Sequence, residues 1–248
     1  MGKSNHKGTN NKDSRPKDDK RKDMNQKEIN EDKREEIKES GQAVLDQNGG
    51  QYKIQLITII GEIEGHDVLG SNVKTTKYEH ILPKIAAIHD DQSIDGVLVL
   101  LHTMGGDVEA GLAIAEMLAS VGKPTVSLVL GGSHSIGIPI AVSTDYSFIV
   151  PTGTMVVHPV RMSGTVIGAP QTYDYFRQMQ NRISTFVANH SNIGKDRFEE
   201  LLMETGILTK DVGTILEGEE AVEEGIINKV GGLKEAVKEL KRRIDKYR

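Results

Sequence analysis

The chain has 248 residues, a net charge of −5 and no cysteine. The missing thiols exclude disulfides and thiolate metal sites, and the slightly acidic balance gives no reason to expect nucleic-acid binding. A membrane span needs about 18 apolar residues, and the sequence contains no such run. Residues 1–50 contain no apolar run that would serve as a signal peptide. These features predict a cytoplasmic protein without a membrane span.

Residues 1–48 are predicted to form a disordered, charged N-terminal tail. Acidic and basic side chains dominate this range, and aliphatic ones are rare. Such a segment buries too little apolar surface to offset the entropy that it would lose on ordering. A solubilising role and a docking or regulatory role both remain open for it. The pair Gly49-Gly50 suits a linker, so residues 49–248 are expected to form the folded domain.

Residues 49–248 alternate between strand and helix patterns. β-branched runs indicate strands, and apolar residues spaced three and four apart indicate helices. In chain order the patterns predict a strand at 52–63, a helix at 77–89, strands and helices alternating at 94–101, 108–121, 124–130 and 135–143, one or two short strands within 146–157, and helices at 171–189, 195–204, 219–224 and 233–247. This alternation is typical of an α/β domain built from repeated strand–helix units.

Three turns at the ends of predicted strands carry residues suited to chemistry. The first, Thr103-Met104-Gly105-Gly106-Asp107, places two glycines between a strand and a helix. Glycines let a ligand approach the backbone closely, and an amide ahead of a helix can face a developing negative charge. A plain tight turn is the alternative, and Asp107 suits the N-cap of the following helix.

The second turn is Leu130-Gly131-Gly132-Ser133-His134-Ser135-Ile136-Gly137. Ser135 lies where a strand gives way to a helix, so its hydroxyl would face a cleft beside amides that favour an oxyanion. Helix capping is the ordinary role of a serine at this position. Ser133 is a rival nucleophile.

The third turn is Met155-Val156-Val157-His158-Pro159, in which His158 closes an apolar strand and Pro159 ends it. A histidine there can reach a neighbouring serine as general base, and a structural histidine is the alternative. Taken in order, the three turns offer oxyanion donors, a nucleophile and a base at successive strand ends. This is the set that acyl transfer needs.

These motifs resemble those of the Clp protease proteolytic subunit family. The family's Ser-Pro-Gly-Gly, Gly-x-Ala-Ala-Ser-Met-Gly and Met-Ile-His-Gln-Pro motifs correspond to residues 103–106, 131–137 and 156–159. The spacing from the second glycine to the serine agrees without a gap, and the resemblance spans about residues 55–235. It implies an α/β, ClpP/crotonase-like spiral of repeated β-β-α units, with a handle helix from the segment 171–205.

By this resemblance the chain is a serine endopeptidase that needs no metal or organic cofactor. Ser135 is the nucleophile, His158 is its base, and the amides of Gly106 and Ile136 form the oxyanion hole. The resemblance also implies polypeptide substrates, a homo-oligomeric ring and a possible separate ATP-dependent unfoldase. Any such ATPase must be another protein, because this chain contains no P-loop.

One departure concerns the third catalytic residue. The family has an aspartate shortly before an Ala-x-x-x-Gly-Leu-x-Asp motif, which corresponds here to residues 221–228, and an ungapped match puts Gly213 at that aspartate. Asp211 lies two residues earlier and is expected to orient His158 after a small slip in register. A helix cap or a solvated loop charge is its alternative. Without it a serine–histidine dyad can still work, more slowly.

Three other interpretations remain open. A signal-peptide-peptidase-like enzyme would use a serine–lysine pair, with Lys195 or Lys210 as the lysine. A crotonase-type acyl-CoA enzyme would use the two amides without the serine. A Clp-like scaffold would assemble without cleaving, and the displaced aspartate is the best argument for it.

Overall fold

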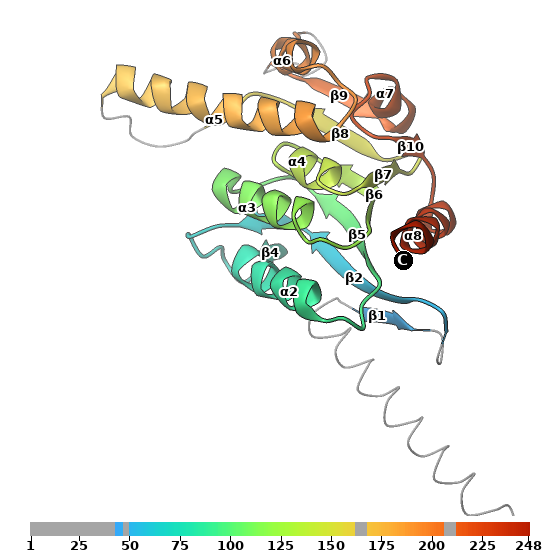
Figure 1. The fold of residues 1–248 in the computed structure, drawn as a ribbon. Helices are drawn as coiled ribbons and strands as arrows, with labels where there is room; N and C mark the ends of the chain where they lie inside the picture. Colours follow the sequence, from blue (N-terminus) through green and yellow to red (C-terminus); the bar gives the residue numbers. More distant parts are fainter. Residues whose placement is uncertain (1–42, 47–49, 162–167, 206–211) are drawn as a thin grey trace, which may run out of the picture. The chain divides into compact units, whose positions relative to one another are not determined.

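A mostly parallel sheet forms the centre of the fold (Figure 1). The computed structural model describes residues 43–46, 50–161, 168–205 and 212–248, and residues 44–248 form one compact unit. The strands of the sheet follow the order β1 (Ala43–Asp46), β2 (Lys53–Ile60), β5 (Gly96–Thr103), β6 (Thr125–Ser133), β7 (Tyr146–Ile149) and β10 (Lys229–Val230). β1 falls inside the range predicted as tail, whose residues 1–42 lie outside the described part.

Alternate residues of the central strands pack into two separate cores, because side chains of a strand point to opposite faces. On β5, Val97 and Val99 join the larger core, and Leu98 joins the smaller one. The larger core is covered by α2 (Tyr78–Asp90), α3 (Val108–Ala119) and α4 (Gly137–Val142), and the smaller one by α8 (Leu233–Tyr247). The sheet therefore has helices on both faces, as its nearly continuous apolar strands require.

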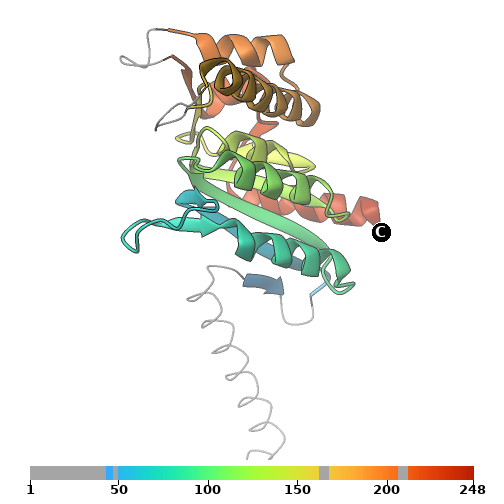
Figure 2. The same ribbon diagram turned by 90° about the vertical axis from the view of Figure 1, so that its left-hand side faces the viewer.

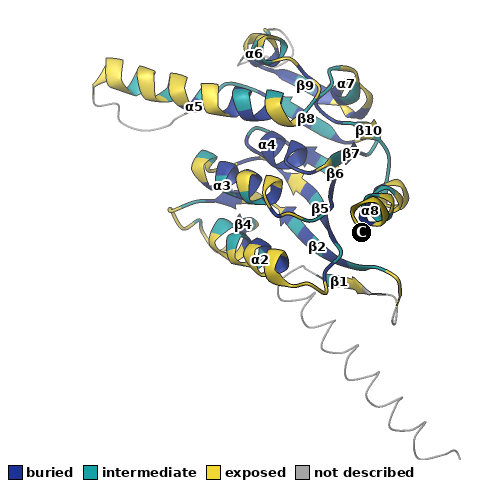
Figure 3. Cartoon of the chain, viewed as in Figure 1, coloured by how far each residue is buried: buried dark blue, intermediate teal, exposed yellow. Residues whose placement is uncertain are grey.

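The helices form where the sequence predicts them, and their buried residues follow the helical period. α2 buries Ile81, Ile85 and Ile88, which lie on one face of the helix. On α8 the buried positions are Ala236, Leu240 and Ile244, each one turn from the next. Figure 3 shows both helices buried on the side that meets the sheet and exposed on the other. Asp107 is the N-cap of α3, as predicted, and accepts a hydrogen bond of 2.8 Å from the amide of Ala110.

Strand β6 is longer than predicted, and its two parts have different neighbours. Its first part pairs with β7 over residues 126–129, whereas Gly132 pairs with Thr154 of β8 (Thr154–Val157). β8 in turn pairs antiparallel with β9 (Thr214–Glu217). This fork brings the ends of β6 and β8 together, and those ends carry the predicted serine and histidine.

A helical layer covers the paired strands β8 and β9. It consists of α5 (Ala169–His190), α6 (Lys195–Met203) and α7 (Gly218–Glu223), and Figure 2 shows α5 beside α6. Arg182 of α5 pairs with Glu109 of α3 through both terminal guanidinium nitrogens, which ties α5 to α3. The N-terminal half of α5 is largely exposed (Figure 3), as the handle implied by the resemblance would be.

The predicted strand at 52–63 is divided by Gly61, which has a φ of +84°. The part after it forms β3 (Glu62–Glu64), which pairs with β4 (Thr75–Lys77) in a sheet of its own. Within the described residues, none of the helices combines the length and the apolar character that crossing a bilayer requires.

Candidate active site

A pocket of about 240 Å³ opens where β6 and β8 end. The predicted nucleophile Ser135, the predicted base His158 and the predicted oxyanion residues Gly106 and Ile136 all line it. The fifth predicted residue, Asp211, lies outside the described residues. The rest of the wall is mainly apolar and comes from Met104, Val108, Ile138, Val157, Val160, Ile183, Phe198 and Leu202, with Arg161 and Gln180 as polar members.

Ser135 has an unusual backbone conformation. Its φ is +55°, and it is the one non-glycine residue with positive φ among the described residues. A non-glycine residue in this region costs roughly 1–3 kcal/mol and persists only where surrounding contacts impose it. Here the amide of Ser135 donates to the carbonyl of Val156 on β8 at 2.9 Å. A sharp turn between a strand and a helix also presents the nucleophilic serine of α/β-hydrolases.

The structure separates Ser135 from its two alternatives. The N-cap of α4 is Ile136, so Ser135 does not fill the capping position. Ser133 is fully buried, and its hydroxyl donates to the carbonyl of Gly137 at 2.8 Å. Of these two serines, only Ser135 lines the pocket.

The glycine turn at 105–106 lies directly against the serine turn. Gly105 has a φ of +93°, and a Cβ atom on it would come within 2.8 Å of the Ser135 Cβ. Gly106 has a φ of +148°, and a Cβ atom there would lie 2.3 Å from the carbonyl oxygen of Ile63. Side chains at these positions would push the two turns apart, so the double glycine reflects close approach rather than a plain tight turn.

Two backbone amides in the pocket are free to bind an anion. Those of Gly106 and Ile136 have no hydrogen-bond acceptor within the part of the chain that the structure describes. Their neighbours are engaged, since the amide of Asp107 donates to Ile63 and that of Gly137 donates to His134. Buried amides are almost always paired, so two unpaired amides lining one pocket beside a serine match an oxyanion hole.

The imidazole of His158 is oriented by its own chain. Its Nδ1 lies 2.7 Å from the carbonyl oxygen of Pro159. A carbonyl can only accept, so Nδ1 carries the hydrogen. In the neutral ring Nε2 is then the unprotonated nitrogen, which is the tautomer that a general base needs.

Position 213 lies beside His158, as the ungapped match to the family's aspartate suggests, but glycine offers no carboxylate. A Cβ atom on Gly213 would lie 3.0 Å from the Cβ of His158 and only 2.5 Å from the carbonyl oxygen of Val157. The φ of Gly213 is +131°, a conformation that other residues rarely adopt. The backbone therefore passes the histidine too closely to accommodate a side chain in this conformation.

Two further histidines lie near the turn but outside the pocket wall. The imidazole of His134 packs over Gly132 and has its Nε2 2.9 Å from the hydroxyl of Thr154, and the ring of His102 packs over Gly131. Burial lowers the pKa of His134, and the neighbouring charges of His102 and His158 lower that pKa further. His134 is therefore neutral at pH 7 and does not supply charge to the site.

No lysine is among the described residues that line the pocket. Lys195 is held by Asn181 of α5 and by Glu199 of α6. Lys210 lies outside the described residues. The serine–lysine interpretation therefore has no support from Lys195.

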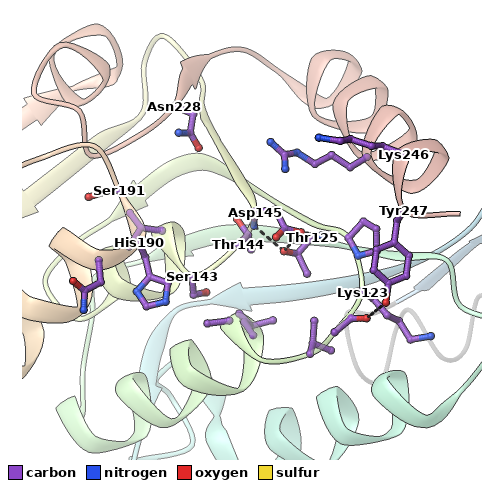
Figure 4. Close-up of a pocket in the computed structure, with 18 of the residues that line it drawn as sticks. Lys123, Thr125, Ser143, Thr144, Asp145, His190, Ser191, Asn228, Lys246 and Tyr247 are labelled. Atoms are coloured by element: carbon purple, nitrogen blue, oxygen red, sulfur yellow. Dashed lines mark hydrogen bonds between the residues drawn. The ribbon is translucent and has the colours of Figure 1, made fainter.

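A larger pocket of about 690 Å³ lies elsewhere, between α8 and the C-terminal end of α5 (Figure 4). Its polar side chains already serve the fold: Asp145 accepts from the amide and hydroxyl of Thr125, and Tyr247 donates to Gly122. His190 bonds to the carbonyl of Phe186 one turn earlier. Size alone therefore does not identify the reactive site, and the smaller pocket has the chemically suited groups.

Sequence reasoning missed the roles of two residues that shape the site. The hydroxyl of Thr103 donates to Gly61 at 2.6 Å and accepts from the amide of Gly105 at 3.0 Å, which fixes the glycine turn. Gln180 of α5 reaches the backbone just after His158. No local pattern distinguishes Gln180 from the other polar residues of its helix.

Comparisons with known proteins identify the family and the fold of this chain. The sequence profile of the Clp protease family matches residues 51–234. The translocation-enhancing protein TepA of Halalkalibacterium halodurans is 51% identical over 212 residues, which cover 86% of this chain and 82% of that protein. The solved structure of a point mutant of ClpP1 from Listeria monocytogenes superposes with a TM-score of 0.59 at 18% identity, over 73% of this chain and 94% of that one. The last likeness concerns the fold, and it confirms the ClpP/crotonase-like prediction. The profile match and the 51% identity to TepA show that the chain belongs to the Clp protease family.

Proposed function

We propose that this protein is a serine endopeptidase whose nucleophile is Ser135 and whose general base is His158. The observation that carries the proposal is the shared pocket, in which a serine at φ +55° lies with that histidine and two unpaired amides. Membership of the Clp protease family supports the same reaction.

The proposed reaction has two steps. Nε2 of His158 takes the proton of the Ser135 hydroxyl while Oγ attacks the peptide carbonyl carbon, and the amides of Gly106 and Ile136 bind the resulting oxyanion. The tetrahedral intermediate then breaks its C–N bond, and His158 returns the proton to the leaving amine. A water molecule, activated by the same histidine, hydrolyses the ester and frees the serine.

The pocket wall suggests which residue precedes the cleaved bond. Val108, Ile138, Ile183, Phe198 and Leu202 give it an apolar interior. A charged side chain would lose hydration among these apolar groups, so we propose cleavage after apolar residues.

We also propose that the protein acts as a homo-oligomeric ring in the cytoplasm, on polypeptides that a separate unfoldase delivers. Tyr173 and Tyr175 on α5 and Met203 on α6 are more than half exposed. Exposed apolar side chains gathered on neighbouring helices are typical of a protein–protein interface. The second candidate function, a Clp-like scaffold of little or no activity, is favoured by the glycine at position 213.

Labelling with a fluorophosphonate, which reacts with activated serines, tests the endopeptidase proposal. We expect the full-length protein to be labelled and Ser135→Ala to lose all labelling. Ser133→Ala is the matched control and should retain labelling, because the hydroxyl of Ser133 bonds to the carbonyl of Gly137 and does not line the pocket. A wild-type protein that is assembled but unlabelled would favour the scaffold instead.

A further inference from the structure

The peptide group between Pro159 and Val160 is bonded at both of its ends. Its carbonyl accepts from Nδ1 of His158 at 2.7 Å, and its N–H donates to Oε1 of Gln180 at 2.9 Å. The carbonyl and the N–H belong to one rigid, planar peptide group. Fixing the N–H therefore also fixes the direction in which the carbonyl points toward the imidazole.

The orientation of the Gln180 side-chain amide follows from the chemistry of its partner. The partner of Val160 is a backbone N–H, which can only donate, so the oxygen of Gln180 must face it and the nitrogen must point away. That nitrogen, Nε2, is buried and has no partner among the residues that the structure describes. The bond to Val160 is thus the contact that holds this amide within the described part of the chain.

Charged and titratable groups lie near His158 on several of the described elements. His134 on the serine turn and Arg161 in the pocket are cationic when they are charged. Glu204, at the end of α6, is engaged by Arg197 at 3.3 Å and by the hydroxyl of Thr214 at 3.0 Å. On the β9 side, Gly213 presents only backbone to the imidazole.

We propose that Gln180 is a positioning residue of the active site, and that the Pro159–Val160 peptide group it holds orients His158. This inference rests on the proposed serine–histidine chemistry. The peptide dipole points its negative end at Nδ1–H, so it fixes the required tautomer and stabilises the imidazolium that forms when Ser135 loses its proton. The bond from Val160 to Gln180 polarises the same peptide and strengthens its carbonyl as an acceptor.

The first test compares rates of fluorophosphonate labelling across pH in the full-length protein. Gln180→Ala frees the peptide to rotate, and we expect its labelling rate at pH 7 to fall by about 10- to 100-fold, as for other groups that orient a functional histidine. Gln180→Glu keeps the acceptor and adds a negative charge that is linked to the imidazole through the same peptide group. It should retain labelling, with the acid limb of its pH profile moved to higher pH because the imidazolium is stabilised.

Gln178→Ala is the matched control, since Gln178 is an exposed glutamine on the same helix. It should label at the wild-type rate with an unchanged pH profile. A purely structural role for Gln180 would lower the rate without moving the acid limb in Gln180→Glu. Wild-type labelling by Gln180→Ala, or an unmoved acid limb in a folded Gln180→Glu, would overturn the proposal.

A second measurement does not depend on activity and so separates this proposal from the proposed function. Nitrogen-15 NMR of the histidine side chains, assigned with His158→Gln, reports which ring nitrogen carries the hydrogen. We expect His158 to have the hydrogen on Nδ1 in the wild type, to lose that preference in Gln180→Ala, and to titrate at higher pH in Gln180→Glu. The same tautomer in wild type and Gln180→Ala would refute the positioning role even in a protein that never labels.

Discussion

At the residue scale, the backbone conformations of Ser135 and Gly213 limit what each residue can present to the pocket. Ser135 is held in a left-handed conformation by its bond to β8 and by the glycines packed beneath it. Gly213, which an ungapped match would set against the family's aspartate, brings only its backbone to His158. The serine turn therefore keeps the strained geometry that suits a nucleophile, whereas position 213 offers the histidine no carboxylate.

Restoring the aspartate at position 213 should fail. In Gly213→Asp the new Cβ meets the carbonyl of Val157 in a backbone conformation that favours glycine, so we expect a loss of about 1–3 kcal/mol in the free energy of unfolding and no gain in labelling rate. Urea denaturation and fluorophosphonate labelling measure the two effects. Gly194→Ala, at a glycine with open space around its Cβ position, should change neither. A stable Gly213→Asp that labels faster would contradict this account.

His134 should make the fold sensitive to acid. Its pKa in the folded state lies below the ordinary value of 6.5, mainly through burial, so the unfolded chain binds the proton first as the pH falls. The stabilising contribution of the neutral imidazole is present above pH 6.5 and is lost as the pH falls below that value. His134→Gln should therefore lose less stability than the wild type between pH 7 and pH 5.

Thermal unfolding in that pH range checks the difference, with His80→Gln as the control because His80 is exposed on α2. If the wild type and His134→Gln lost the same stability over this pH range, the burial of this imidazole would not contribute to the acid sensitivity.

The elements are positioned by contacts that tie one layer to the next. Arg182 joins α5 to α3, and Arg197 joins α6 to Glu224 through two hydrogen bonds of 2.9 and 2.7 Å. Arg197 lowers the pKa of Glu224 and is itself kept charged by it. These pairs are partly exposed, so each contributes up to about 1 kcal/mol. The larger share of the stability comes from apolar packing.

Helix α8 packs an apolar face against the sheet. Leu240 of α8 is fully buried where the helix packs on the sheet. It belongs to the core that includes Leu98, Leu128 and Phe148. Leu240→Ala should lower the free energy of unfolding by about 2–5 kcal/mol, because it removes apolar contact and leaves a cavity. Chemical denaturation measures this loss. Lys238→Ala, at an exposed position on the same helix, should be nearly neutral.

On the scale of the whole molecule, α5 and α6 leave an apolar surface uncovered in the single chain. Tyr173 is 68% exposed and Met203 is 63% exposed. If the ring that we propose forms through this surface, Tyr173→Glu should shift the protein to smaller species in size-exclusion chromatography with light scattering, because a carboxylate would have to be desolvated at the interface. Val68→Glu makes the same kind of change at a position that is 82% exposed, and should leave the mass unchanged.

Local patterns in the sequence were sufficient to predict most of the elements and to propose the nucleophile and the base. The helical spacing of Ile81, Ile85 and Ile88 is visible without coordinates, and so are the glycines that precede Ser135. Such signals are local because period, capping and turn chemistry depend on neighbours within a few residues. The match of three ordered motifs extended them to a family, which the comparisons confirm.

Tertiary structure alone decided how these pieces meet. The fork of β6 between β7 and β8, the burial of Ser133, the approach of Gly213 to His158 and the bond from Gln180 to Val160 all join residues from separate elements. A sequence pattern does not report such contacts, because they depend on how the strands pair and how α5 packs across them. The chain by itself determined which residues offer chemistry, and the fold decided which of them share a pocket.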